Sequence, residues 1–347
     1  MQTLDARSPK RRRTSSTPKP LFIVAPGESP ELPNGQEKFT RHADFWLDDG
    51  NLILLAGDTA FRVYKGLLTK NSGVFADMFA TGSADATETF DSCPVVRLPD
   101  HPADLSDFLQ YLMPCSKLRL CDGLPVSDFA ELHAAIHLAH KYQCPDVEMR
   151  ALSLLKNFYS PPLADHHVHA HSPKSPMARP PRLAAIAAAN VARLTETPSM
   201  IPFALYQVST LEGAMLDGYA RRDGSIEHLS ASDLRLCIDA RGSLAHEMVL
   251  YVRSAFTPGH SDRCTNIEQC TMALNDIRDD MEERLGTCDI LDAYKGRPIE
   301  VWLADFELCE ACAGEVLVRE DAERRRVWRL LPGIFGMTAK ECGFPQY

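Results

Sequence analysis

The feature that most constrains the fold is a change of apolar period between residues 59 and 79. Residues 59–63 alternate between polar and apolar side chains with a period of two, as a half-buried strand does. From Tyr64 onward the apolar residues recur at helical spacings, and Ser72 is placed to cap the second helical run. This segment therefore predicts a packed globular domain in which a strand leads directly into helices.

Further strands and helices surround this switch. Residues 45–56 hold two apolar runs separated by an Asp-Gly-Asn turn, which predicts a hairpin-like or bulged strand pair. Residues 93–98 (CPVVRL) predict a third strand, with Pro94 at a position where a missing N–H costs little. Helical periodicity follows over residues 104–113, 127–142 and 146–159. Strands come first and helices follow, which is typical of the α+β class.

Composition divides the chain into a tail, two domains and a linker. We expect residues 1–39 to be a disordered tail and lead-in, residues 40–160 to form the α+β domain, and residues 183–335 to form a mainly α-helical domain. Residues 161–182 contain six prolines and four histidines, which is typical of an exposed linker. Residues 336–347 complete the chain as a short tail.

The predicted helical domain has four candidate helices. They cover residues 183–194, 232–256, 266–285 and 311–331. Ser232 is placed to cap the second, Gly286 to end the third, and Pro332 to stop the fourth. Trp302, Phe306 and Trp328 are the expected aromatic anchors of this core.

Charge is unevenly distributed along the chain. The whole chain carries a net charge of −10, but residues 1–20 hold six basic side chains and one acidic side chain. Phosphate neutralisation dominates nucleic-acid affinity, so the acidic folded body is not expected to bind nucleic acid. Within the tail, Lys10, Arg11, Arg12 and Arg13 have the form of a nuclear-import signal, and a solvated basic terminus explains them equally well.

The sequence contains no run that approaches the roughly 20 apolar residues needed to cross a bilayer, and its start has no apolar signal core. We therefore expect a soluble, intracellular protein in the nucleus or the cytoplasm. The basic tail slightly favours the nucleus.

Several motifs in the first domain occur together in a defined order. They are Asp44 at the first strand, residues 61–68 (FRVYKGLL) and residues 72–79 (SGVFADMF). This combination resembles the opening of a BTB/POZ domain, and the similarity continues to about residue 160. Tyr64 departs from the pattern, because the family usually has histidine there. The complete layout is similar to that of the single-BTB proteins of mushroom-forming fungi.

The resemblance implies a small sheet with a helical bundle and a function in protein binding without catalysis. It implies homodimerisation or recruitment of a partner, either in transcriptional regulation or as an adaptor to a cullin-type ubiquitin-ligase scaffold. Asp44 and Lys65 match family positions that line a charged pocket near the dimer interface. The alternative is that Asp44 is an exposed strand-edge carboxylate and Lys65 a solvated residue at a helix start.

The cysteines of the C-terminal half form two close pairs, Cys264-x5-Cys270 and Cys309-x2-Cys312, with His260 and Cys288 nearby in the sequence. Two such pairs are a common way to present four ligands to zinc. The two pairs have different spacings, however, and we favour the alternative that these thiols pack as small apolar side chains. The second function hypothesis is therefore a zinc-stabilised regulator or metalloenzyme built on this Cys/His cluster.

Familiar catalytic motifs are absent from the sequence, which has neither a Gly-x-Ser-x-Gly elbow nor a phosphate-binding loop. His246-Glu247 begins like a zinc-protease helix, but Leu250 occupies the position of the second ligand. The histidine run at residues 166–171 is at most a weak metal binder. We therefore expect no enzymatic activity and, zinc aside, no cofactor.

Overall fold

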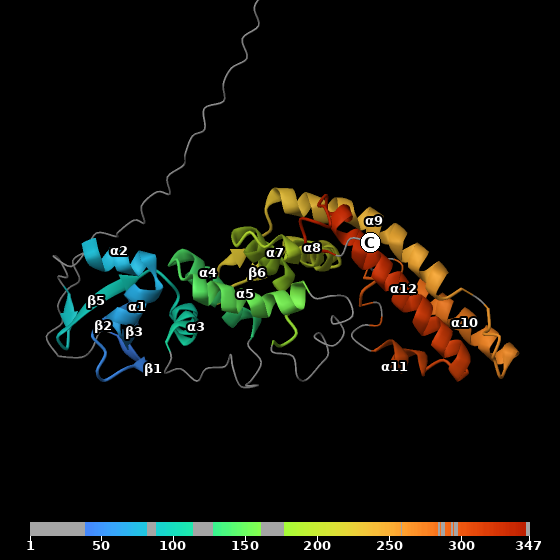
Figure 1. The fold of residues 1–347 in the computed structure, drawn as a ribbon, viewed down its shortest axis with the longest axis horizontal. Coiled ribbons are helices and arrows are strands. Elements are labelled where there is room, and N and C mark those ends of the chain that lie inside the picture. Colours follow the sequence, from blue (N-terminus) through green and yellow to red (C-terminus); the bar gives the residue numbers. More distant parts are fainter. Residues whose placement is uncertain are drawn as a thin grey trace, which may run out of the picture. The chain divides into compact units, whose positions relative to one another are not determined.

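The computed structural model describes most of the chain. The described residues are 39–81, 88–113, 128–160, 177–257, 259–283, 285, 289–292, 294 and 298–344. They belong to one compact unit that begins at Phe39 (Figure 1). Lys10, Arg11, Arg12 and Arg13 lie outside the described residues, as does the histidine-rich part of the predicted linker.

The first half of the described chain, residues 39–160, contains a five-stranded sheet in the order β1-β3-β2-β5-β4. Its strands are β1 (Thr40–Trp46), β2 (Leu52–Ala56), β3 (Thr59–Val63), β4 (Thr89–Phe90) and β5 (Cys93–Leu98). β2 and β3 form an antiparallel hairpin, while β5 runs parallel to β2 and β1 runs parallel to β3. Together with the helices this sheet confirms the α+β class, and β5 has the predicted bounds.

The predicted pairing of the two apolar runs in residues 45–56 is wrong, because β3 lies between β1 and β2. The Asp-Gly-Asn segment does turn, since the N–H of Gly50 donates to the carbonyl of Leu47 at 2.9 Å, but it leads to a contact with β3: the side chain of Arg62 donates to the carbonyl of Gly50 at 2.8 Å. A Cβ atom on Gly50 would lie 2.8 Å from Cγ of Arg62, so this close approach requires glycine.

The described residues of the first half form five helices, two between β3 and β4 and three after β5. They are α1 (Lys65–Asn71), α2 (Gly73–Thr81), α3 (Pro102–Leu112), α4 (Phe129–Lys141) and α5 (Pro145–Tyr159). The predicted cap of α2 is confirmed, since the hydroxyl of Ser72 accepts a hydrogen bond from the N–H of Phe75 at 3.0 Å. A capping box between Asp128 and Glu131 begins α4.

Strand β2 is buried on both faces. Leu52, Leu54 and Ala56 pack into one apolar cluster with side chains of α1 to α5. The alternate residues Ile53 and Leu55 face a smaller cluster on the other side of the sheet. Burial of a leucine or isoleucine contributes about 1.5–3 kcal/mol, so this strand is a major source of stability in the first half.

The second half, which comprises the described residues from 177 to 344, is mainly helical. Its longer elements are α7 (Ala184–Leu194), α8 (Ile201–Ser209), α9 (Ala231–Ala255), α10 (Ile267–Glu282), α11 (Ile299–Leu303) and α12 (Glu310–Ile334). α9 and α12 lie side by side (Figure 1). A short hairpin of β6 (Tyr219–Ala220) and β7 (Ile226–Glu227) precedes α9. None of the described helices is long and apolar enough to cross a membrane.

The predicted end of the last helix is wrong, because α12 continues through Pro332 to Ile334. The helix ends instead in a Schellman motif. Gly336 adopts a φ of +68°, and the N–H of Met337 donates to the carbonyl of Pro332 at 2.8 Å. Pro332 is tolerated because it lies in the last turn, where the loss of one hydrogen bond is a limited cost.

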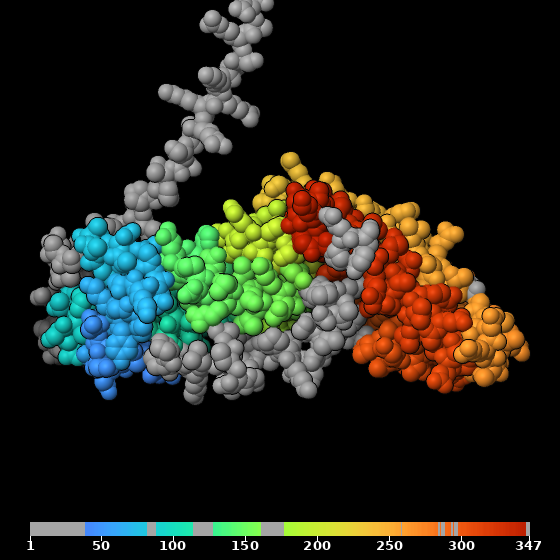
Figure 2. Space-filling model, in the orientation of Figure 1, coloured from blue at the N-terminus to red at the C-terminus, as the bar shows by residue number. Residues whose placement is uncertain are grey.

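The two halves share a large apolar cluster. It contains residues of α4 and α5 together with residues of α7, α8, α9 and α12. The alanines of α7 are buried on nearly all sides, so neighbouring helices approach it closely. In the space-filling view the surface of α4 and α5 (green) continues into that of α7 and α8 (yellow-green) (Figure 2). The two-domain division and its linker stay a prediction.

Candidate metal centre

Four cysteines converge where two helices begin in the second half. Cys264 lies in the loop before α10, and Cys270 lies in the first turns of that helix. Cys309 is the N-cap of α12, and Cys312 lies in its first turn. Each helix start, together with the residues just before it, therefore presents two thiols, and the two segments are well separated in the sequence.

The sulfur atoms of this four-cysteine centre all lie within 4.8 Å of one another. The sulfur atoms of Cys264 and Cys309 are 3.9 Å apart, and all four thiols are free. A disulfide requires a separation of about 2.0 Å. In a tetrahedral zinc site with bonds of about 2.3 Å, two sulfur atoms lie about 3.8 Å apart. The spacing of the centre is thus that of metal ligands.

Backbone N–H groups point at the sulfur atoms. The N–H of Ser261 donates to Sγ of Cys312 at 3.3 Å, and the N–H of Cys309 donates to Sγ of Cys270 at 3.4 Å. Such donors stabilise a thiolate and fix the direction of its lone pairs. They are the supporting contacts that a thiolate ligand requires.

Cys309 and Cys312 have unequal acidities. The backbone N–H groups of Thr265 and Cys312 lower the pKa of Cys309 to about 6. Burial raises the pKa of Cys312 to about 12. Four negative charges at this separation repel one another, so full deprotonation requires a cation among them. Of these two thiols, Cys309 loses its proton more readily.

The centre is braced by polar and apolar contacts. The side-chain amide of Gln269 in α10 donates to Glu307 in the loop before α12 at 2.7 Å, which joins the two ligand-bearing segments. The same helices contribute Leu274, Ile277 and Val316 to an apolar cluster with Trp302 of α11. A metal ion at the centre would fix the start of both helices above this cluster.

The structure brings together Cys264, Cys270, Cys309 and Cys312. His260 is not in this group, and its Nδ1 lies 3.1 Å from the carbonyl oxygen of Ser261. Cys288 and the histidines of residues 166–171 lie outside the described residues.

A second group of candidate ligands, His133, His137 and Glu227, was missed in the sequence. Its ligand atoms also lie within 4.8 Å of one another. Part of the signal was available, since two histidines four residues apart on a helix share a face. No local pattern connected them with Glu227, which lies on β7.

Asp44 and Lys65 are placed on different elements of the first half. Asp44 is exposed on β1, where its N–H donates to Nδ1 of His42 at 3.2 Å. Lys65 is the first residue of α1, and its ammonium group lies 4.9 Å from the ring centre of Phe79. No ion pair between Asp44 and Lys65 is recorded in the described part of the chain. The charged pocket therefore stays a prediction.

Comparison of the sequence with known proteins found no matching family model and no matching curated protein. The resemblance of residues 40–160 to a BTB/POZ domain accordingly remains an expectation. The chemistry of the second half is interpreted from the geometry of its thiols.

Proposed function

We propose that this protein is a non-enzymatic protein-interaction module whose C-terminal helices are held by a structural zinc ion on Cys264, Cys270, Cys309 and Cys312. The convergence of the four sulfur atoms within 4.8 Å is the observation that carries the zinc part of this proposal. Packing of small apolar thiols does not require backbone N–H groups directed at the sulfur atoms, whereas thiolate ligands do.

The ligand set favours a structural site over a catalytic one. Four thiolates complete a tetrahedron, and catalytic zinc requires a position left open for water or substrate. The metalloenzyme alternative is therefore the weaker one. Tetrahedral sulfur ligands suit zinc or iron, and zinc is the ion without redox chemistry.

The interaction function is proposed for the first half. Its support is the order of elements that the BTB/POZ resemblance implies: a strand hairpin, a helical pair, a further strand beside the hairpin, and more helices. β1 is an edge strand with mostly exposed side chains, and exposed edges pair readily with another chain. Half-buried Leu67, Val74 and Met78 on α1 and α2 supply further apolar surface at the rim of the core cluster.

The partner is proposed to be a second copy of the chain or another protein. A transcriptional regulator and an adaptor to a cullin-type scaffold are the two roles that the resemblance suggests. The residues Lys10, Arg11, Arg12 and Arg13 would direct the protein to the nucleus. No part of the proposal involves nucleic acid or a membrane.

Metal analysis of the full chain, purified without chelators, tests the zinc proposal. We expect about one tightly held zinc ion in this centre, lost in Cys309→Ser/Cys312→Ser. Cys237→Ala is the matched control, because Cys237 is a buried thiol of another apolar cluster, and it should keep the metal. Zinc content unchanged by the double substitution would overturn the proposal.

Light scattering of the full chain tests the interaction proposal. We expect a dimer that Met78→Asp on α2 weakens. Met149→Asp on α5 is the control, because Met149 is already 64% exposed, and it should leave the dimer intact. A wild-type chain that stays monomeric at high micromolar concentration removes the dimerisation claim.

A further inference from the structure

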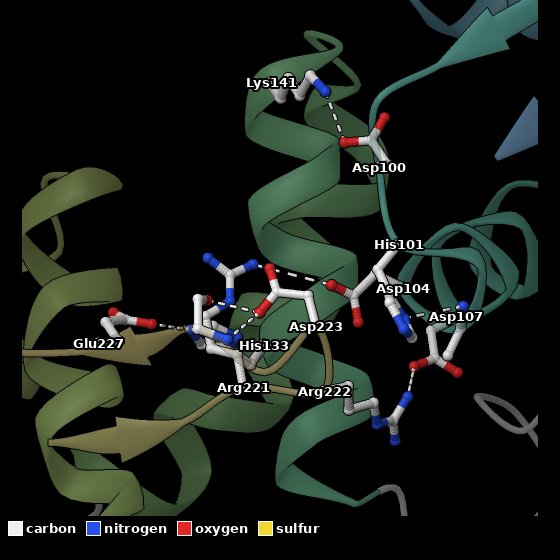
Figure 3. A network of polar contacts seen from close by, with 12 residues as sticks. Asp100, His101, Asp104, Asp107, His133, Lys141, Arg221, Arg222, Asp223 and Glu227 are labelled. Atoms are coloured by element: carbon white, nitrogen blue, oxygen red, sulfur yellow. Dashed lines mark hydrogen bonds and ion pairs between the residues drawn. The ribbon is translucent and has the colours of Figure 1, made fainter. Parts of the chain in front are cut away.

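Two histidines and one glutamate meet where the β6–β7 hairpin packs on α4. His133 and His137 are one turn apart on α4, so their rings lie on one face of the helix. Glu227 reaches them from β7, and its Oε2 lies 3.0 Å from Nε2 of His133. Figure 3 shows Glu227 directed at His133 from the neighbouring hairpin.

The hairpin is fixed in this position by other contacts. Arg221 and Arg222 lie beside Asp104 and Asp107 of α3 (Figure 3). The side-chain amide of Asn190 donates to Oε1 of Glu227 at 2.8 Å, which leaves the other carboxylate oxygen facing the histidines. The glutamate is therefore oriented by a neighbour, as ligating carboxylates commonly are.

Three polar atoms at this place are buried and make no aligned hydrogen bond to the described residues. They are Nε2 of His133, Nε2 of His137 and Oε2 of Glu227. Burial of a polar atom without a hydrogen bond is unfavourable. Nε2 of His133 and Oε2 of Glu227 are in contact at 3.0 Å, whereas Nε2 of His137 has no hydrogen-bond partner among the described residues. A metal ion would take the place of the proton between His133 and Glu227 and bind His137 as well.

The separations suit a shared metal ion. Nitrogen and oxygen ligands at about 2.0–2.1 Å from tetrahedral zinc lie about 3.3 Å apart. The atoms of His133 and Glu227 are 3.0 Å apart, and His137 lies within 4.8 Å of both. His133 is only 3% exposed, so the ion would be held away from bulk water. Two imidazoles and one carboxylate are a ligand set that zinc accepts.

The charges around the group allow a divalent ion. The carboxylate of Glu227 places a negative charge beside the two imidazole rings. Arg221 also acts on His137 and opposes a cation. Its guanidinium lies 3.8 Å from the carboxylate of Asp104, which offsets part of this repulsion.

We propose that His133, His137 and Glu227 bind a divalent transition-metal ion of the zinc type, which links α4 of the first half to the β6–β7 hairpin of the second. This second centre is independent of the four-cysteine centre. It would anchor the hairpin to α4 in addition to the arginine–aspartate pairs on α3.

The test is zinc content and zinc affinity of the full chain. We expect about two zinc ions per chain in the wild type and about one in Glu227→Gln and in His137→Gln. Glu227→Gln keeps an oxygen that accepts from Asn190 but loses the charge, and we expect it to weaken the second site by at least about tenfold. His140→Gln is the matched control, because His140 lies on α4 outside the group and contacts Glu148.

Three further measurements distinguish this site from other zinc ligands. Cys309→Ser/Cys312→Ser removes only the four-cysteine ion, so the two proposals fail separately. Replacement of His166, His167, His169 and His171 by Asn should not change the zinc content. Co²⁺ added to wild-type protein that already holds one equivalent of Zn²⁺ should give visible absorption bands without thiolate charge-transfer bands.

Three results overturn the proposal. One is a wild-type chain that binds only the four-cysteine ion, which would leave His133 and Glu227 as an unmetallated pair. Another is a second ion that persists in both Glu227→Gln and His137→Gln. The third is a second ion that disappears when the histidines of residues 166–171 are replaced.

Discussion

The sulfur atoms of Cys264 and Cys309 lie 3.9 Å apart although 45 positions separate them in the sequence. This separation is too long for a disulfide and close to the separation of two thiolates on one zinc ion. The chain therefore uses two loops and two helix starts to assemble one centre.

Removal of zinc should destabilise the second half. The ion would hold the starts of α10 and α12 above the apolar cluster around Trp302, so its loss should lower the free energy of unfolding by several kcal/mol. Thermal unfolding with and without a strong chelator measures this effect. In a Glu227→Gln background, which lacks the second centre, Cys312→Ser should remove most of the response to the chelator, whereas Cys237→Ala should retain it. An identical unfolding temperature with and without chelator in the wild type contradicts the prediction.

Stability should fall as the pH rises from about 4 to about 6 because of Asp107. Burial raises the pKa of Asp107 to about 6 despite its ion pair with Arg222. The folded state therefore binds a proton that the unfolded state has lost across this range, and the free energy of unfolding decreases on the order of 2 kcal/mol as the pH rises. Urea unfolding at several pH values measures the slope.

Asp107→Asn should remove this part of the pH dependence. Asp77→Asn is the control, because Asp77 is exposed on α2, and it should leave the slope as in the wild type. Equal slopes for the wild type and Asp107→Asn would show that another group titrates in this range.

Gly218→Ala should destabilise the β6–β7 hairpin. Gly218 has a φ of +81°, and an added Cβ would lie 2.5 Å from Cγ2 of Ile226. Backbone strain and the clash together should cost about 1–3 kcal/mol. Gly224→Ala is a matched control with the same φ but no atom within 4 Å of the added Cβ. Urea unfolding should show the larger loss for Gly218→Ala, and equal losses would contradict the role of the close approach.

Local periodicity predicted much of the secondary structure. β5, α7 and α10 begin within a residue or so of their expected positions because each has a clear repeat or a cap, such as Asn266 before α10. α8 was not predicted. It is buried on nearly all sides and begins with Pro202 in its first turn, so it has no apolar stripe that distinguishes it from a loop.

Pairings between distant segments were harder to predict from the sequence than the helices and strands themselves. The Asp-Gly-Asn turn suggested a hairpin, but the partner of β1 is β3, and strand order is not encoded in a local turn. Likewise, the spacing of Cys264, Cys270, Cys309 and Cys312 identified candidates without separating metal binding from packing. Only the tertiary arrangement places their sulfur atoms together.

X-ray absorption at the zinc edge tests the central claim most directly. The sample should be the full chain carrying Glu227→Gln, so that ligands of the second centre do not contribute to the signal. We predict about four sulfur neighbours at about 2.3 Å from zinc. Zinc surrounded by nitrogen and oxygen atoms, or a protein that retains no zinc, would contradict the account.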